Sequence, residues 1–123
     1  MPKFCANLTM LFNEVDVLDR FEKAAKAGFK GVEYLFPYAW KKEQLVEKLG
    51  AFGLIQTLHN LPAGDWNKGE RGIACLPGRE NEFKEGVGKA IEYAKTLKCP
   101  QVNCLAGLTP AGVPADKVRK TLV

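Results

Sequence analysis

The chain has 123 residues, of which 46% are hydrophobic and 26% are charged, a balance typical of one water-soluble globular domain with a buried core. It contains no apolar run of about 18 residues, which excludes a membrane-spanning helix, and its start, MPKFCANLTMLF, lacks the features of a signal peptide. We therefore expect a cytoplasmic protein. The net charge of +4 comes from lysines spread singly along the chain, so neither nucleic acid nor a membrane is expected as a partner.

Four cysteines are present, at positions 5, 75, 99 and 104, and none belongs to a C-x-x-C pair. Cys5 and Cys104 lie in apolar, strand-like runs, where small buried thiols are common. Cytoplasmic proteins keep their thiols reduced. We therefore expect four reduced cysteines with a structural role.

The first half of the chain alternates predicted strands with predicted helices. A strand is expected near residues 3–8, and apolar residues at helical spacing follow Asp16, a residue type common at a helix N-cap, and end at Gly28. GVEYLF predicts a second strand near residues 31–35. A second helical stripe follows and is closed by Gly53.

The second half repeats this alternation after a long loop. A third strand is expected near residues 54–59, a helix follows between Phe83 and Leu97, and a fourth strand is expected near residues 101–105. The final DKVRKTLV begins a fourth helix. Strands that alternate with helices in this way imply right-handed crossovers and a parallel sheet covered by helices.

Two parallel-sheet architectures compete. A doubly wound sheet would place a glycine-rich phosphate loop after its first strand, but ANLTMLFNEVD contains no such motif. About three and a half strand–helix units in this length extrapolate to about 250 residues for eight units, the usual size of a TIM barrel. We therefore expect an α/β fold in which residues 1–123 form the N-terminal half of a TIM-barrel domain, truncated in its fourth helix.

Polar residues stand near the end of every predicted strand. A TIM barrel carries its active site at the carboxyl ends of its strands. A buried polar group without a partner costs about 1–3 kcal/mol, so a shared polar cavity explains these residues better than chance. We predict that four of them contact a substrate: Asn7, His59, Asn60 and Asn103. Glu33 is placed near the site, either as a catalytic base or as a buried hydrogen-bonded strut.

The loop TLHNLPAGDWNKGERGIACLPGR concentrates hydrogen-bond donors and glycines without a helical or strand period. Arg71 and Arg79 can hold a carboxylate in a bidentate manner, and Trp66 can shield a pocket from water. The alternatives are ion pairs of the arginines with Glu70 or Glu80 and a purely structural Trp66. We interpret residues 65–78 as a lid over the strand ends and place Glu70 near the site.

Four stretches carry a family resemblance: FCANLTMLF, FEKAAKAGFKGVEYLFPY, TLHNLPAGDWNKGERGIACLPGRE and VNCLAGLTPAG. They resemble the N-terminal half of the hydroxypyruvate isomerase family, which has a xylose isomerase-like TIM barrel. The resemblance implies interconversion of hydroxypyruvate and tartronate semialdehyde, or, in a related branch, isomerisation of 2-oxo-tetronates. It also implies that two glutamates move the proton, and that they lie beside a divalent metal ion in those family members that bind such an ion.

The resemblance places those glutamates and metal ligands on later strands of the barrel, so no catalytic residue is expected in this chain. One histidine, with Glu33 as the carboxylate well inside a strand, cannot supply the ligands that a divalent ion needs. We therefore expect neither a metal nor another cofactor in these 123 residues. The same count argues against the metal-dependent DNA-repair nucleases that share the barrel class.

Three functional hypotheses remain open. The chain is part of a sugar-acid isomerase and supplies its substrate-recognition residues, or it is a non-catalytic half-barrel that binds a small acid, or it works by pairing with itself or with a complementary half-barrel. In each case the isolated chain is expected to be inactive, because it lacks the glutamates that the resemblance implies. It is also expected to be marginally folded or self-associated, because a half-barrel leaves two open edge strands and an uncovered inner face.

Overall fold

The computed structural model describes residues 1–123 and contains one sheet of four strands in the order β1-β2-β3-β4. The three strand pairings are all parallel. The strands span Cys5–Asn7, Gly31–Glu33, Ile55–Asn60 and Val102–Asn103. The prediction of four parallel strands in sequence order is confirmed, although three of the strands are shorter than expected.

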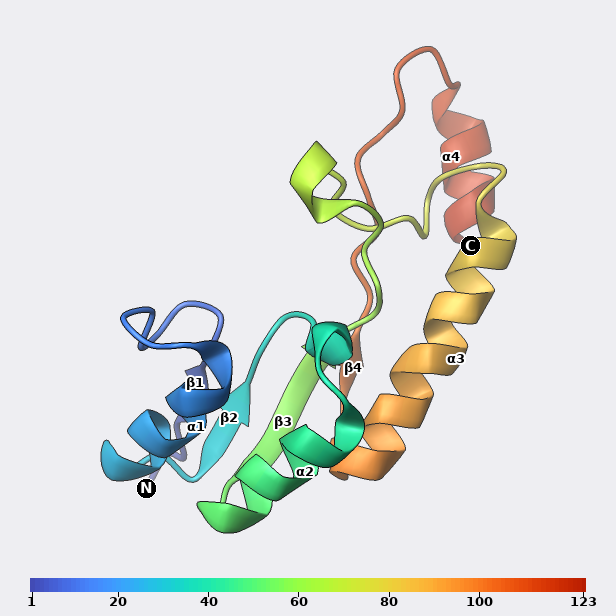
Figure 1. Cartoon of the computed structure of the whole chain (residues 1–123). Coiled ribbons are helices and arrows are strands. Elements are labelled where there is room, and N and C mark those ends of the chain that lie inside the picture. The colour runs from blue at the N-terminus through green and yellow to red at the C-terminus, as the bar shows by residue number, and fades with distance from the viewer.

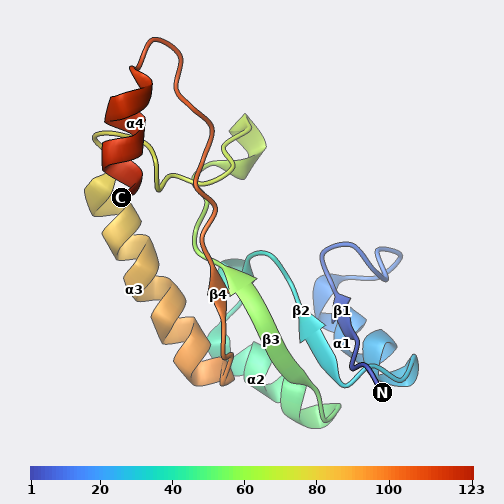
Figure 2. The ribbon, with the colours of Figure 1, turned by 180° about the vertical axis from the view of Figure 1, so that it is seen from behind.

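Helices cover one face of this sheet (Figure 1), and the opposite face is open (Figure 2). The α-helices are α1 Val17–Lys26, α2 Lys42–Ala51, α3 Glu80–Leu97 and α4 Ala115–Leu122, and two short 3-10 helices span Pro37–Ala39 (η1) and Trp66–Lys68 (η2). Each helix from α1 to α3 connects one strand to the next. The result is a partial TIM-barrel fold, as expected.

The helix ends follow the sequence signals in part. Asp16 occupies the N-cap position of α1, but its side chain makes no capping hydrogen bond. Gly28 and Gly53 follow α1 and α2 with φ angles of 91° and 61°, a conformation that glycine adopts without strain. The long helix α3 ends at Leu97 and has no glycine after it; its C-cap residue Lys98 takes the same left-handed conformation at φ 53°.

The core lies between the sheet and its helices. One buried cluster includes Ala6 and Val32 of the sheet together with Phe21 of α1 and Leu45 of α2, all of them fully buried. The prediction of buried Cys5 and Cys104 is wrong, because both thiols are exposed, whereas Cys75 and Cys99 are buried. All four thiols are free.

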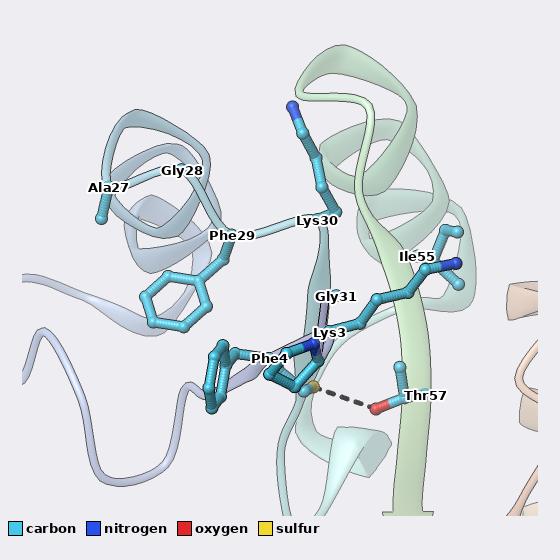
Figure 3. Close-up of a pocket in the computed structure, with 11 residues that line it drawn as sticks. Lys3, Phe4, Ala27, Gly28, Phe29, Lys30, Gly31, Ile55 and Thr57 are labelled. Carbon is cyan, nitrogen blue, oxygen red and sulfur yellow. Dashed lines mark hydrogen bonds between the residues drawn. The ribbon is translucent and has the colours of Figure 1, made fainter.

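The open face of the sheet exposes apolar side chains. Phe4 is 73% exposed and Ile55 is 63% exposed. With Phe29 and Thr57 they line a hollow of about 810 Å³ at the amino ends of the strands, where Thr57 Oγ1 lies 3.0 Å from Cys5 Sγ (Figure 3). Because barrel active sites lie at the opposite, carboxyl ends, we assign this hollow no part in substrate binding.

A buried chain of hydrogen bonds links the sheet to α3. The Tyr34 hydroxyl donates to Gln56 Oε1, and Gln56 Nε2 lies 3.0 Å from His59 Nδ1. An amide nitrogen can only donate, so Nδ1 accepts and the ring proton sits on Nε2, which lies 3.2 Å from the Ala90 carbonyl oxygen. Both ring nitrogens are therefore engaged on the helix side of the sheet.

His59 is 1% exposed, and burial lowers its pKa although the hydrogen bond to Ala90 opposes that shift. The sequence predicted a substrate contact for this residue. The structure instead gives it no free donor or acceptor, because strand β3 turns its side chain toward α3. His59 belongs to the core.

The β3–α3 loop, residues 61–79, lies at the carboxyl ends of the strands, as expected for the segment interpreted as a lid (Figure 1). Gly72 N–H donates to the Ala63 carbonyl at 3.0 Å, and Cys75 N–H donates to the Ala106 carbonyl at 2.8 Å. Gly72 and Ala106 form an isolated antiparallel bridge. The loop is thus tied both to its own beginning and to the segment after β4.

Gly72 is required at this bridge. Its φ is 110°, and a Cβ atom built on it would lie 2.0 Å from the Leu105 carbonyl oxygen. We expect Gly72→Ala to destabilise the protein by about 1–2 kcal/mol for the positive φ and by about 1–3 kcal/mol more for the overlap. Gly78→Ala is the matched control, since φ is 87° there and nothing lies within 4 Å of the added atom. Equal urea midpoints for the two variants would contradict the required close approach.

The buried neutral His59 predicts a pH dependence of stability. The pKa of His59 is lower in the folded protein, so the unfolded chain binds a proton more readily as the pH falls. The contribution of the neutral His59 to the free energy of unfolding is therefore fully present above about pH 6.5 and decreases as the pH drops below that value. We expect His59→Gln to lose this part of the decrease between pH 7.5 and 5.5. Urea unfolding of both proteins at the two pH values measures it, and identical pH dependences would refute the explanation. This is the chain's single histidine, so no other imidazole contributes.

Candidate functional site

Asn7 and Glu33 form a polar pair at the carboxyl ends of β1 and β2. They are register partners, and Asn7 Nδ2 donates to Glu33 Oε1 at 3.1 Å. Asn7 Oδ1 accepts a hydrogen bond from Thr9 N–H, and Thr9 Oγ1 accepts one from Leu35 N–H, each at 3.0 Å. Both members of the pair are partly exposed, so they brace the strand ends and still face solvent.

Asn60 and Asn103 form a second pair at the ends of β3 and β4. They too are register partners, with Asn103 Nδ2 donating to Asn60 Oδ1 at 2.9 Å. Asn60 is only 4% exposed, and its backbone carbonyl accepts the Tyr38 hydroxyl. Asn103 is exposed. The structure therefore joins Asn7 with Glu33, and Asn60 with Asn103, in two hydrogen-bonded pairs at the strand ends. His59 is the one predicted strand-end residue that belongs to neither pair.

An aromatic and cationic stack lies in the β3–α3 loop. The Trp66 ring contacts Phe36, which follows β2, in an edge-on arrangement with 5.0 Å between ring centroids. The Arg71 guanidinium lies over the Trp66 ring at 3.9 Å, a cation–π geometry. Arg71 Nη1 also donates to the carbonyls of Trp66 and Glu70, at 3.1 and 2.7 Å.

The two predicted arginines differ in what remains available on them. Arg71 is exposed, and its Nε and Nη2 groups make no hydrogen bond within the chain. Arg79 is engaged by two carboxylates: it donates through Nε and Nη2 to Glu82, each at 2.8 Å, and through Nη1 and Nη2 to Glu70. Of the two, Arg71 can bind an anion with unpaired N–H groups, and Arg79 cannot do so without losing its partners.

The predicted binding role of Arg79 therefore does not agree with its contacts. The alternative from the sequence was an ion pair with Glu70 or Glu80. The structure shows the pair with Glu70, and the second carboxylate is that of Glu82 and not of Glu80. Glu80 accepts a hydrogen bond from Gly78 N–H. The i, i+3 spacing of Arg79 and Glu82 at the start of α3 was a usable sequence signal for this pair.

Sequence reasoning also missed Gln56. It is a polar residue inside strand β3, 1% exposed, and it carries the link between Tyr34 and His59. The available signal in the sequence was its place in the apolar run LIQTLHNL, two residues after Leu54 and two before Leu58. Its partners come from other elements, so only the folded chain identifies them.

The described residues do not fit a metal centre. No group of three or more histidine, cysteine, aspartate or glutamate side chains could hold a metal ion. Glu33 stands as a single carboxylate beside an amide.

None of the helices combines the length and the apolar character that a membrane span requires.

Curated relatives are similar over the whole chain. It is 57% identical over 123 residues to hydroxypyruvate isomerase of Escherichia coli and covers 48% of that protein. It is 49% identical over 123 residues to 2-oxo-tetronate isomerase of Haemophilus influenzae and again covers 48%. The chain thus spans about half the length of these relatives.

A solved structure from Brucella melitensis, described as an AP endonuclease of family 2, matches with a TM-score of 0.95 and 44% identity, over 99% of this chain and 47% of that one. A sequence model described as xylose isomerase-like TIM barrel matches residues 21–123. This match covers most of the chain and agrees with its four parallel strands. The chain therefore belongs to the xylose isomerase-like TIM barrel family.

Proposed function

We propose that this chain supplies the substrate-recognition half of an aldose–ketose type isomerase that interconverts hydroxypyruvate and tartronate semialdehyde in the cytoplasm. The observation that carries the proposal is the exposed Arg71 guanidinium, held over Trp66 with Nε and Nη2 unpaired. The similarity to hydroxypyruvate isomerase of E. coli supports the reaction. The substrate class is a small 2-oxo acid.

Arg71 suits the carboxylate of such an acid. The two unpaired N–H groups lie on one edge of the guanidinium plane, which matches the two oxygens of a carboxylate. Trp66 and the loop around it would shield the bound acid from water. Asn7 and Asn103 lie at strand ends with amide groups that can serve the hydroxyl and carbonyl oxygens of the substrate.

The reaction itself needs more than this chain holds. Moving a carbonyl to the adjacent carbon requires a carboxylate base that takes the α proton and a cation or donor that stabilises the enediolate. The family resemblance assigns these roles to two glutamates, beside a divalent metal where one is used, on strands beyond the four described here. The remainder of a barrel would close over the open face of this sheet and bring them to Arg71.

A second candidate is isomerisation of 2-oxo-tetronates. It is favoured by the similarity to 2-oxo-tetronate isomerases, of which the relative from H. influenzae is 49% identical. Both substrate types present a carboxylate beside a carbonyl, so the same guanidinium contact serves either. The difference lies in the length of the acid beyond those two groups.

A chimera tests the proposed reaction. Residues 1–123 are joined to the part of the E. coli relative that they do not match, and the isolated chain is assayed beside it. We expect the chimera to isomerise hydroxypyruvate at an ordinary enzyme rate, on the order of 1–10³ per second, and the isolated chain to show no turnover. A folded chimera that acts on 2-oxo-tetronates alone would favour the second candidate. Turnover by the isolated chain would show that its own residues include the catalytic groups.

The role of Arg71 is tested in the same chimera. Hydrogen bonds to a charged group contribute about 1.5–3 kcal/mol, so we expect Arg71→Gln to lower kcat/KM about tenfold to a hundredfold, chiefly through KM. Lys68→Gln, which removes an exposed positive charge from the same loop, is the control and should leave KM within about twofold. An unchanged KM in Arg71→Gln would exclude the carboxylate contact.

A further inference from the structure

The tip of the β3–α3 loop, residues 65–70, is closed by one side chain. Glu70 N–H donates to the Asp65 carbonyl at 3.1 Å, and the Glu70 carboxylate accepts the Asp65 N–H through Oε2. Between these two residues lie the 3-10 turn Trp66–Lys68 and Gly69 at φ 91°. Glu70 therefore holds both ends of the segment that carries Trp66.

The same carboxylate ties this tip to helix α3. Both Glu70 oxygens accept N–H groups of Arg79, which occupies the N-cap position of α3. Arg79 is held in turn by Glu82 in the first turn of the helix. Helix α3 has 18 residues and buries Ala90 and Leu97 in the protein interior, so it is a rigid support.

The position of the loop tip beside α3 depends on the positive charge of Arg79. Hydrogen bonds from Arg79 lower the pKa of both Glu70 and Glu82, and those two carboxylates raise the pKa of Arg79. The proximity of Glu70 works in the opposite direction on Glu82. Loss of Arg79 would therefore leave two negative charges facing each other and push the loop tip away from α3.

The carboxylate also has little room to move. A Cβ atom on Gly64 would lie 2.0 Å from Glu70 Oε2, so the loop backbone passes directly against it. The Arg79 and Glu70 side chains are 30% and 28% exposed. Isolated surface ion pairs contribute little, but bidentate arginine–carboxylate pairs within a network are the exception.

We infer that Glu70 and Arg79 form a clamp that positions Trp66 and Arg71 at the carboxyl ends of the strands. Arg79 is then a positioning residue that acts through the loop and does not touch the substrate. The contacts of Glu70 with Asp65 and with Arg79 define the clamp. Its consequence for substrate binding rests on the proposed function of Arg71.

The clamp is tested first in the 123-residue chain with Trp40→Phe, which leaves Trp66 as the single tryptophan. The measurement is quenching of Trp66 fluorescence by acrylamide, an uncharged probe, in folded protein. We expect Arg79→Gln and Glu70→Gln to increase quenching and their combination to add little. Glu85→Gln is the matched control, because it removes a carboxylate charge from an exposed position on α3 that contacts neither Arg79 nor the loop tip, and it should leave quenching unchanged.

A second readout separates the clamp from the proposed function. In the active chimera, a displaced Arg71 should raise KM about tenfold or more in Arg79→Gln and Glu70→Gln, with Glu85→Gln close to the parent protein. Unchanged quenching in the two clamp variants would overturn the clamp, whatever the kinetics show. Increased quenching with an unchanged KM would support the clamp and overturn the role of Arg71 in binding the substrate. Circular dichroism confirms that each variant compared is folded.

Discussion

The backbone of Gly72 lies against that of Leu105 and Ala106, and the placement of the β3–α3 loop depends on this contact. The loop leaves β3 and returns to α3, so its ends are set by two rigid elements, but 19 residues between them could take many paths. The bridge to the segment after β4 selects one of these paths. It does so with backbone atoms that no side chain could replace.

The parallel sheet sorts its polar residues by the face on which each lies. Gln56 and His59 point to the helices, where they are buried and satisfy each other. Asn7 and Glu33 meet at the strand ends and remain partly open to solvent. Residues that look alike in the sequence as polar interruptions of a strand therefore have two different uses, one in folding and one available for binding.

The two arginines of the loop show the same division. Arg71 stacks on Trp66 and keeps unpaired N–H groups, whereas Arg79 gives its donors to Glu70 and Glu82. Sequence reasoning treated them as equivalent because both are arginines in one glycine-rich stretch. Their roles depend on which carboxylates the fold brings within reach, and one of those carboxylates belongs to the helix that follows the loop.

The sequence by itself determined the architecture: four strands in order, helices between them, and glycines at the ends of α1 and α2, because hydrophobic period and turn chemistry are local properties. It also indicated which strand ends carry polar residues and where the long loop lies. Only the tertiary structure decided that His59 is a core residue bonded to Ala90, that Gly72 must be a glycine, and that Arg79 serves Glu70. Each of these depends on a contact between elements distant in the chain or on the side to which a strand turns its side chain, and a one-dimensional pattern specifies neither.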